Sequence, residues 1–394
     1  MGIIFLALLI YTVFLCLIAT GLIVLSAVSR VKDEPVPEYN PYTLVIVPCR
    51  GKDYSLRQNL MSIKSQSYSN FKLLGVVDSS DDPAVEDLGS TGTDYMISYF
   101  ACSTCSGKVR AITSAIKSHP GFQVYVIADS DITVGKDWLR DLVGPLKDDS
   151  VGLSTTFPYF RPVGGFWSHF KSGWGAVGKA LMRSRATRFG WGGSLAFRAS
   201  LLDDRSLEFF SLSVSDDTAL TEICKTKGLE IQYSERAEPV VNSPESLSQF
   251  LEWSDRQTAL SISASPEVFT YGLLYYSLEI LLLISALIFS VIITPLFLLL
   301  VVPEVVKTVN LSREIPESAR YAPIIEIILP FFYIANLFRA SRMDKITWRG
   351  RSYALQRNRR MSESSRRENN NNAANHAIES SLENDGASNG WGVK

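Results

Sequence analysis

Residues 124–131, VYVIADSD, are the stretch that decides the expected fold. The first five residues are apolar, which is typical of a buried strand in a parallel sheet. Asp129 and Asp131 come directly after that strand and lie on the same side of an extended chain, because side chains alternate. Open α/β sheets bind ligands at the carboxyl ends of their strands. The two carboxylates are therefore a candidate site for a divalent metal and the diphosphate that it neutralises; a solvated turn is the alternative.

Further strand and helix patterns surround this stretch and define the fold class. Strands are predicted at residues 43–48 (TLVIVP), 71–77 (FKLLGVV) and 95–100, with helices near residues 55–65 and after Gly107-Lys108. Strands that alternate with helices predict an α/β fold with a mostly parallel sheet. We expect this soluble domain to occupy residues 40–262.

Polar residues follow the predicted strands. Asp78, Asp81 and Asp82 form an acidic loop that is suited to accept hydrogen bonds from a base or a ribose, although an ordinary turn has the same composition. Lys108 follows Gly107 at a predicted helix start, where glycine lets the backbone approach a phosphate and lysine supplies a positive charge. Each signal is weak by itself, and the order in which they occur along the chain makes them informative.

Apolar stretches near both ends of the chain are long enough to cross a membrane. Residues 1–30 hold an almost wholly apolar run, and we expect an uncleaved anchor because no basic segment precedes it. A second membrane region is expected within residues 270–342, with spans at about 273–302 and 321–340. The first of these two spans could instead be two shorter helices broken near Pro295.

The basic residues orient these spans. Arg30 and Lys32 follow the anchor, and a basic segment occupies residues 343–360, whereas the loop at residues 303–320 holds three basic residues. The positive-inside rule then predicts that the central domain and the tail both face the cytoplasm. Residues 361–394, rich in serine, arginine and asparagine, lack core-forming residues and are expected to be disordered.

Overall charge and cysteine content exclude little. The formal net charge of −1 gives no indication of nucleic-acid binding. Cys102 and Cys105 form a single C-x-x-C, without the second pair or histidine cluster of a zinc site. Reduced thiols are the expectation in a reducing compartment, and a redox pair is the alternative.

The order of these motifs resembles that of the family 2 glycosyltransferases, which have the nucleotide-sugar-binding fold called GT-A. Residues 192–198 (GGSLAFR) are similar to the glycine-serine segment of that family. Residues 215–220 (SDDTAL) are similar to its E-D-x-x-(L/M) segment, whose second acid is the catalytic base. The resemblance therefore implies that Asp217 is the base and that Asp216 stands in place of the usual glutamate.

A closer resemblance is to the ceramide glucosyltransferases and related lipid glycosyltransferases. It is carried by residues 81–84 (DDPA), 151–153 (VGL), 246–250 (SLSQF) and 346–353 (ITWRGRSY). The (Q/R)-x-x-R-W segment of these enzymes falls on residues 253–257 (WSDRQ), which keep Arg256 but have Trp253 and Gln257 at the two ends. The resemblance implies that Arg256 holds the diphosphate, whereas Asp255 could partly neutralise it. An amphipathic helix with exposed charges is the alternative for this segment.

The resemblance implies an inverting transfer of a sugar from a nucleotide donor, expected to be UDP-glucose or a similar UDP-hexose. Mg²⁺ or Mn²⁺ at Asp129 and Asp131 would neutralise the leaving diphosphate, with Asp129 also reaching the nucleotide. Lys108 and Arg256 would add positive charge, and Asp217 would take the proton from the acceptor.

The expected acceptor is the hydroxyl of a membrane lipid, ceramide or another. Aromatic and basic residues mix between residues 164 and 193, which suits a bilayer interface but also a core helix with a solvated basic face. Two other functions stay open: a processive polysaccharide synthase, which needs more membrane spans, and a non-catalytic scaffold or sensor that keeps the fold.

Overall fold

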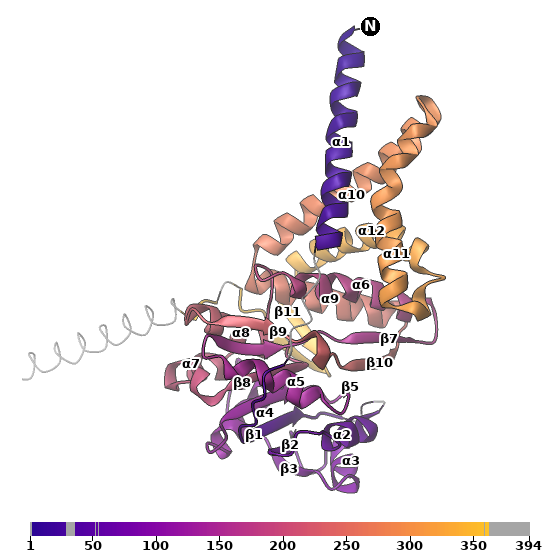
Figure 1. The fold of residues 1–394 in the computed structure, drawn as a ribbon. Helices are drawn as coiled ribbons and strands as arrows, with labels where there is room; N and C mark the ends of the chain where they lie inside the picture. The colour runs from indigo at the N-terminus through magenta and orange to yellow at the C-terminus, as the bar shows by residue number, and fades with distance from the viewer. Residues whose placement is uncertain (1, 29–35, 52, 54, 358, 362–394) are drawn as a thin grey trace, which may run out of the picture.

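The fold comes from a computed structural model, which describes residues 2–28, 36–51, 53, 55–357 and 359–361. Figure 1 shows an α/β domain at one end of the molecule and a group of long helices at the other, with the N terminus at the tip of the helices. The expectations for Arg30, for Lys32 and for the tail beyond Met361 concern residues outside the described ranges.

A seven-stranded sheet forms the α/β domain. Its strands, in spatial order, are β3 (Asp94–Ile97), β2 (Phe71–Val77), β1 (Thr43–Pro48), β4 (Val124–Ala128), β8 (Ser194–Arg198), β6 (Val151–Thr155) and β9 (Glu230–Tyr233). Strand β8 runs antiparallel to both of its neighbours, and the other adjacent pairs are parallel. The mostly parallel α/β fold expected from the sequence is confirmed.

Helices cover both faces of this sheet. They are α2 (Leu56–Lys64), α3 (Ala84–Ser90), α4 (Gly107–Ser118), α5 (Trp138–Val143), α7 (Asp204–Ser211) and α8 (Asp216–Thr226). Leu44 and Ile46 of β1 pack in the core that includes α4, α7 and α8, whereas Val45 and Val47 pack in the core that includes α2 and α5. Because both faces are buried, the strands are continuous apolar runs, and the carboxyl ends of β1, β2 and β4 are held at one edge.

A second layer joins the α/β domain to the long helices. It consists of the sheet β5 (Ile132–Thr133), β10 (Val240–Pro244) and β7 (Tyr159–Val163), with helices α6 (Phe166–Arg183) and α9 (Leu247–Ala264). The rings of Phe170 and Phe250, from these two helices, lie 5.2 Å apart in a shared core. Cations of α6 pair with glutamates, as Lys179 Nζ does with Glu238 Oε1 at 2.7 Å. The structure thus favours the packed-helix interpretation of residues 164–193, with a basic face that is paired.

Within the described residues, four segments are long and apolar enough to cross a membrane. They are Ile3–Val24 within α1 (Gly2–Val28), α10 (Glu267–Ile292), Pro295–Glu314, and α12 (Ala322–Ser341). The third segment combines the 3-10 helix η4 (Pro295–Val301) with helix α11 (Val302–Glu314). Membrane spans at both ends of the α/β domain therefore agree with the sequence, but their division differs.

The stretch expected as one span at about 273–302 is divided in the structure by a break near Pro295. Helix α10 ends at Ile292, Thr294 is extended, and η4 turns back against α10. Proline has no amide hydrogen and its ring clashes with a preceding helical turn, which explains why the helix stops before Pro295.

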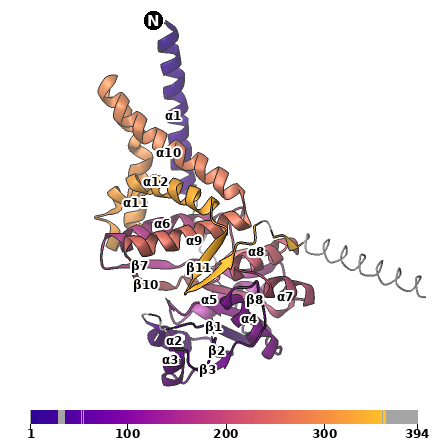
Figure 2. The ribbon, with the colours of Figure 1, turned by 180° about the vertical axis from the view of Figure 1, so that it is seen from behind.

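The break leaves the segment after the helices beside the α/β domain. Helix α12 packs against α6 and α9, and the hairpin of β11 (Lys345–Trp348) and β12 (Arg351–Ala354) follows it. Figure 2 shows this hairpin, in yellow, running from α12 toward the α/β domain. The hairpin and the sheet edge therefore lie on the same side of the apolar helices.

One lysine forms ion pairs with glutamates of three long helices. Lys307 Nζ of α11 lies 2.7 Å from Glu279 of α10, 2.9 Å from Glu304 of α11 and 3.7 Å from Glu326 of α12. All three glutamates are buried. Buried carboxylates need a cation nearby, so Lys307 stabilises the arrangement of these helices.

We expect Lys307→Met to lower the free energy of unfolding by about 3–5 kcal/mol, because it leaves buried carboxylates without their cation. The exposed Arg313 lies on the same helix, and Arg313→Met is the control for loss of one positive charge. Thermal unfolding of the full chain in detergent measures both variants. Equal unfolding temperatures for the two would show that Lys307 does not hold the helices together.

Candidate active site

The end of strand β4 carries the aspartate pair. The amide of Asp129 donates to the carbonyl of Gly193, and the carboxylate of Asp129 lies 2.7 Å from Lys108 Nζ. Asp131 is accessible to solvent. Even so, the protein crowded around it and the charges of Asp129 and Asp53 raise the pKa of Asp131 to about 6. Unbalanced negative charge therefore gathers at this edge of the sheet.

These carboxylates fit a divalent cation that is shared with a substrate. Among the described residues, no group of three or more histidine, cysteine, aspartate or glutamate side chains is arranged to hold a metal. Mg²⁺ is commonly held by one or two carboxylates together with the phosphates of the substrate, so a complete protein cage is not required. Asp129 and Asp131 could supply that number, and the raised pKa of Asp131 is consistent with a place for positive charge.

Lys108 joins two elements of the site. Helix α4 starts at Gly107, and the Ser106 side chain caps it by accepting from the amide of Val109. From this start Lys108 Nζ reaches Asp129 Oδ1 at 2.7 Å and Asp216 Oδ2 at 3.0 Å. Burial lowers the pKa of Lys108, but these two carboxylates outweigh burial and hold the pKa above its usual value. The lysine expected near a phosphate is thus bound to carboxylates.

Asp216 and Asp217 begin helix α8 and have different surroundings. Asp216 is buried; burial and the charges of Asp217 and Asp129 raise its pKa to about 6, although Lys108 opposes the rise. Asp217 is half-buried. Its Oδ1 accepts from the amide of Thr218 at 2.7 Å and from the Ser215 hydroxyl. Among the described residues, the hydrogen bonds of Asp217 use Oδ1 alone, so the carboxylate keeps a second oxygen for other partners.

The three aspartates of the acidic loop after β2 have different partners. Asp78 is paired with arginines, at 2.9 Å from Arg351 Nη1 and also with Arg110. Asp82 Oδ1 accepts from the amide of Gly51 at 2.9 Å and from that of Ala84 at 3.0 Å. Asp82 therefore fixes the loop after β1, where Gly51 has a φ of +72°.

Asp81, the third acid of this loop, is exposed and bonds with the neighbouring Ser80. The structure thus does not bring Asp81 together with the aspartates at the end of β4. Asp82 and Asp53 instead line a cavity of about 520 Å³ with Arg50, Gly51, Pro83 and Arg349.

Helix α9 carries Arg256 to the same region. Burial lowers the pKa of Arg256 and the charge of Arg349 lowers it further, while Glu252, Asp129 and Asp131 raise it. Asp255 does not neutralise Arg256. It instead pairs with Arg339 Nε of α12 at 2.8 Å and accepts from Asn336.

Trp253, at the altered end of this segment, packs among aromatic side chains. Its ring lies 4.8 Å from the ring of Trp174 and 5.3 Å from that of Phe160, and Lys171 Nζ lies 4.7 Å above it. Position 257 lacks the tryptophan of the family motif. Trp253, earlier on the same helix, is the aromatic residue of this segment, and it packs in the layer beneath the long helices. Arg256 and Asp255 face different partners, so the segment is more than a solvated amphipathic helix.

Sequence patterns did not identify two further residues of the site. Asp53 Oδ1 lies 2.6 Å from Arg349 Nη2, and its other oxygen accepts from the hydroxyl of Ser130. Ser130 lies between the two aspartates at the end of β4. The position of Asp53 after the first strand could have indicated a place in the site. No local pattern shows that Arg349 pairs with it.

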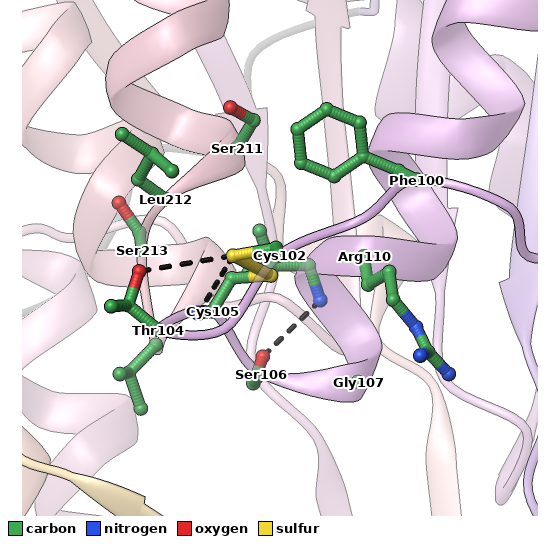
Figure 3. Close-up of a disulfide and its surroundings, with 12 residues drawn as sticks. Phe100, Cys102, Thr104, Cys105, Ser106, Gly107, Arg110, Ser211, Leu212 and Ser213 are labelled. Atoms are coloured by element: carbon green, nitrogen blue, oxygen red, sulfur yellow. Dashed lines mark hydrogen bonds between the residues drawn. A yellow bond between two sulfur atoms is a disulfide. The ribbon is translucent and has the colours of Figure 1, made fainter.

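Cys102 and Cys105 differ from the expectation of reduced thiols. They form a disulfide, with Cα atoms 5.8 Å apart, directly before the start of α4 (Figure 3). The turn between them brings the amide of Cys105 to 2.9 Å from Cys102 Sγ. The two sulfur atoms of the C-x-x-C therefore lie together directly before α4.

A mostly parallel sheet, with carboxylates at its carboxyl edge and helices on both faces, agrees with the GT-A fold expected from the sequence. The profile of Glycosyl transferase family 21 matches residues 9–361, and the chain belongs to that family. It is therefore a glycosyltransferase, as the sequence motifs predicted. No curated protein sequence matches the chain.

The solved structures that are similar to this chain include two glycosyltransferases. One is the mannosyltransferase PcManGT from Pyrobaculum calidifontis in complex with GDP-Man and Mn²⁺, at 16% identity and a TM-score of 0.46, covering 84% of this chain and 96% of that one. The other is glucosyl-3-phosphoglycerate synthase from Mycobacterium tuberculosis in complex with Mn²⁺, UDP and glucosyl-3-phosphoglycerate, at 15% identity and a TM-score of 0.41, covering 60% and 85%.

The link through Lys108 leads to a stability prediction. We expect Lys108→Met to destabilise the protein by about 3–5 kcal/mol, because the buried carboxylate of Asp216 loses its cation. Adding Asp216→Asn should restore part of that loss, since it removes one of the two uncompensated charges. Lys117→Met, an exposed position on the same helix, should cost less than about 1 kcal/mol. Thermal unfolding measures these losses of stability. If the double variant is less stable than Lys108→Met by the full cost of Asp216→Asn alone, the two groups are not coupled.

Proposed function

We propose that this glycosyltransferase moves a hexose from a nucleotide donor to a hydroxyl group of a membrane lipid, with inversion at the anomeric carbon. The observation that carries the proposal is the meeting of Asp129, Lys108 and Asp216, from three separate elements, next to a layer that carries membrane-spanning segments. Family 21 includes ceramide glucosyltransferases, so ceramide and UDP-glucose are the first acceptor and donor to test.

The donor side of the site is built to neutralise a diphosphate. Bound Mg²⁺ or Mn²⁺ would offset the charge of the leaving group, and Asp129 and Asp131 are the residues that would hold it. The two similar structures contain Mn²⁺ with GDP-mannose or UDP, which supports a cation and a nucleotide here. Arg256 adds a positive charge that could pair with phosphate oxygens. It lies close enough to Asp129 and Asp131 for their charges to raise its pKa.

Asp217 is our candidate for the catalytic base. Asp216 is buried and its carboxylate is committed to Lys108, so it is not open to an acceptor hydroxyl. Asp217 keeps one oxygen outside its bonds to Ser215 and Thr218, so it can accept the proton of an acceptor hydroxyl. Direct attack then needs one base, and no carboxylate nucleophile is required on the opposite face.

The acceptor side of the proposed site lies toward the membrane helices. Helices α6 and α9, which pack beside the site, also pack against α12, so an acceptor hydroxyl from a bilayer could reach the sheet edge without leaving the membrane surface. We propose that this surface is the cytoplasmic one, following the basic residues after the last span.

The central experiment measures release of nucleoside diphosphate by the purified full chain in detergent. UDP-hexoses and GDP-mannose are supplied in turn, each with and without a lipid extract. Lipid-dependent release, with one sugar per lipid in the product, supports the proposal. A long glycan product would instead indicate a polysaccharide synthase. No release with any donor and lipid would indicate a non-catalytic scaffold.

The proposed base makes a direct prediction. Asp217→Asn should reduce transfer by about 10²–10⁴-fold, while binding of the nucleotide donor stays close to normal. Asp204→Asn, an exposed aspartate on α7, is the control for removal of a carboxylate. Steady-state transfer and calorimetric donor binding provide the two readouts. Normal turnover by Asp217→Asn would remove this residue from the chemistry.

The proposed cation makes a second prediction. EDTA should abolish transfer, and Mn²⁺ or Mg²⁺ should restore it, because the diphosphate then regains its counter-charge. Asp131→Asn should raise the cation concentration needed for half-maximal rate. Full activity in EDTA would contradict a metal-dependent mechanism.

A further inference from the structure

The β11–β12 hairpin has a turn that places an arginine in an uncommon backbone conformation. Trp348 pairs with Arg351, so the loop consists of Arg349 and Gly350, with φ values of +46° and +75°. Two positive φ values are the requirement of a two-residue type I′ turn. Among the described residues other than glycine, Arg349 alone has a positive φ. Such strain is concentrated at functional positions, so the side chain at the tip of this hairpin is of interest.

The hairpin contacts three loops at the carboxyl edge of the sheet. Arg349 Nη2 lies 2.6 Å from Asp53 after β1, and Arg351 Nη1 lies 2.9 Å from Asp78 after β2. Tyr353 Oη accepts from the amide of Gly107, at the start of α4, at 3.2 Å. A segment that comes after all the apolar helices therefore covers the edge at which an α/β sheet binds its ligand.

The contact at Asp53 extends to the proposed cation site. Asp53 also accepts from the hydroxyl of Ser130, which lies between Asp129 and Asp131. Arg349, Asp53 and Ser130 thus form a continuous path from the hairpin tip to the loop after β4. Movement of the hairpin would alter the support of that loop.

Several arginines gather around the Asp78 carboxylate. Three guanidinium groups approach the Asp78 carboxylate: those of Arg110, of Arg351 at 2.9 Å and of Arg50 at 3.8 Å. Arg50 and Arg349 also line the 520 Å³ cavity, together with Asp53 and Asp82. Asp82 accepts hydrogen bonds from two backbone amides. Guanidinium groups bind phosphate in the same two-pronged geometry as carboxylate.

We infer that the β11–β12 hairpin forms one wall of the donor site, with Arg349 and Arg351 binding the diphosphate of the nucleotide. This inference rests on the proposed use of a nucleotide donor. Asp53 and Asp78 hold the two arginines in position, and phosphate oxygens share or replace these partners when the donor binds. Because the hairpin follows α12 closely, it links the membrane helices to the donor.

The test measures nucleotide affinity rather than transfer. The full chain in detergent, with Mn²⁺, is titrated calorimetrically with UDP and with GDP, and the matching nucleoside is followed by ligand-observed NMR. We expect Arg349→Ala and Arg351→Ala each to weaken diphosphate binding at least ten-fold and to leave nucleoside binding unchanged. Lys345→Ala is the matched control, since Lys345 is an exposed cation on the same hairpin and should behave as wild type.

Several results would overturn the inference. Wild-type affinity for the diphosphate in both arginine variants would do so. Equal weakening of nucleoside and diphosphate would mean that the arginines only support the fold. If neither UDP nor GDP binds the wild-type chain, the proposed function and this inference fall together, whereas wild-type binding with unaffected variants removes the inference alone.

Hydrogen–deuterium exchange of the wild-type chain gives an answer even if the alanine variants do not fold. Amides of residues 345–354 should gain protection when UDP or GDP is added with Mn²⁺, and should gain none with the nucleoside. Unchanged exchange in the hairpin upon binding of the diphosphate would contradict its place in the donor site.

Discussion

The ammonium group of Lys108 is the interaction on which the site depends. It connects the end of β4 to the start of α8, through Asp129 and Asp216, and also donates a hydrogen bond to the carbonyl of Gly192. These elements are distant in the sequence, so their relative position depends on this cation and on the sheet. The same geometry separates two kinds of carboxylate. Asp129 and Asp216 bind the lysine, whereas Asp131 is left open to solvent and Asp217 keeps one oxygen for other partners.

The membrane helices and the site form a continuous structure. Glu279, Glu304 and Glu326 are brought together by Lys307, which fixes α12 relative to the α10–α11 pair. Helix α12 in turn packs against α9, which carries Arg256, and leads into the hairpin that contacts Asp53 and Asp78. A change in the packing of the helices would thereby reach the donor side of the site through two routes, α9 and the hairpin.

Local sequence patterns predicted the parts of this architecture that depend on local forces. The apolar run ending in Asp129 and Asp131 predicted β4, since a strand buried on both faces must be continuously apolar. Gly107-Lys108 predicted the start of α4. These features depend on residues close together in the chain, and each is present where it was expected.

Long-range pairings could not be predicted in the same way. Nothing near Arg349 indicates that it bonds to Asp53, 296 positions earlier. Counting charges favoured one long span at about 273–302, whereas the structure divides this stretch near Pro295. The acidic loop was likewise treated as one unit, although Asp82 binds backbone amides while Asp78 binds arginines.

The measurement that tests the central claim most directly is an experimental structure of the full chain with Mn²⁺ and the nucleoside diphosphate that binds it. The account predicts Mn²⁺ at Asp129 and Asp131, the diphosphate between that ion and Arg256, and the Asp217 carboxylate facing the same space. A nucleotide bound elsewhere, or Asp217 opening onto a different surface from Asp131, would contradict it.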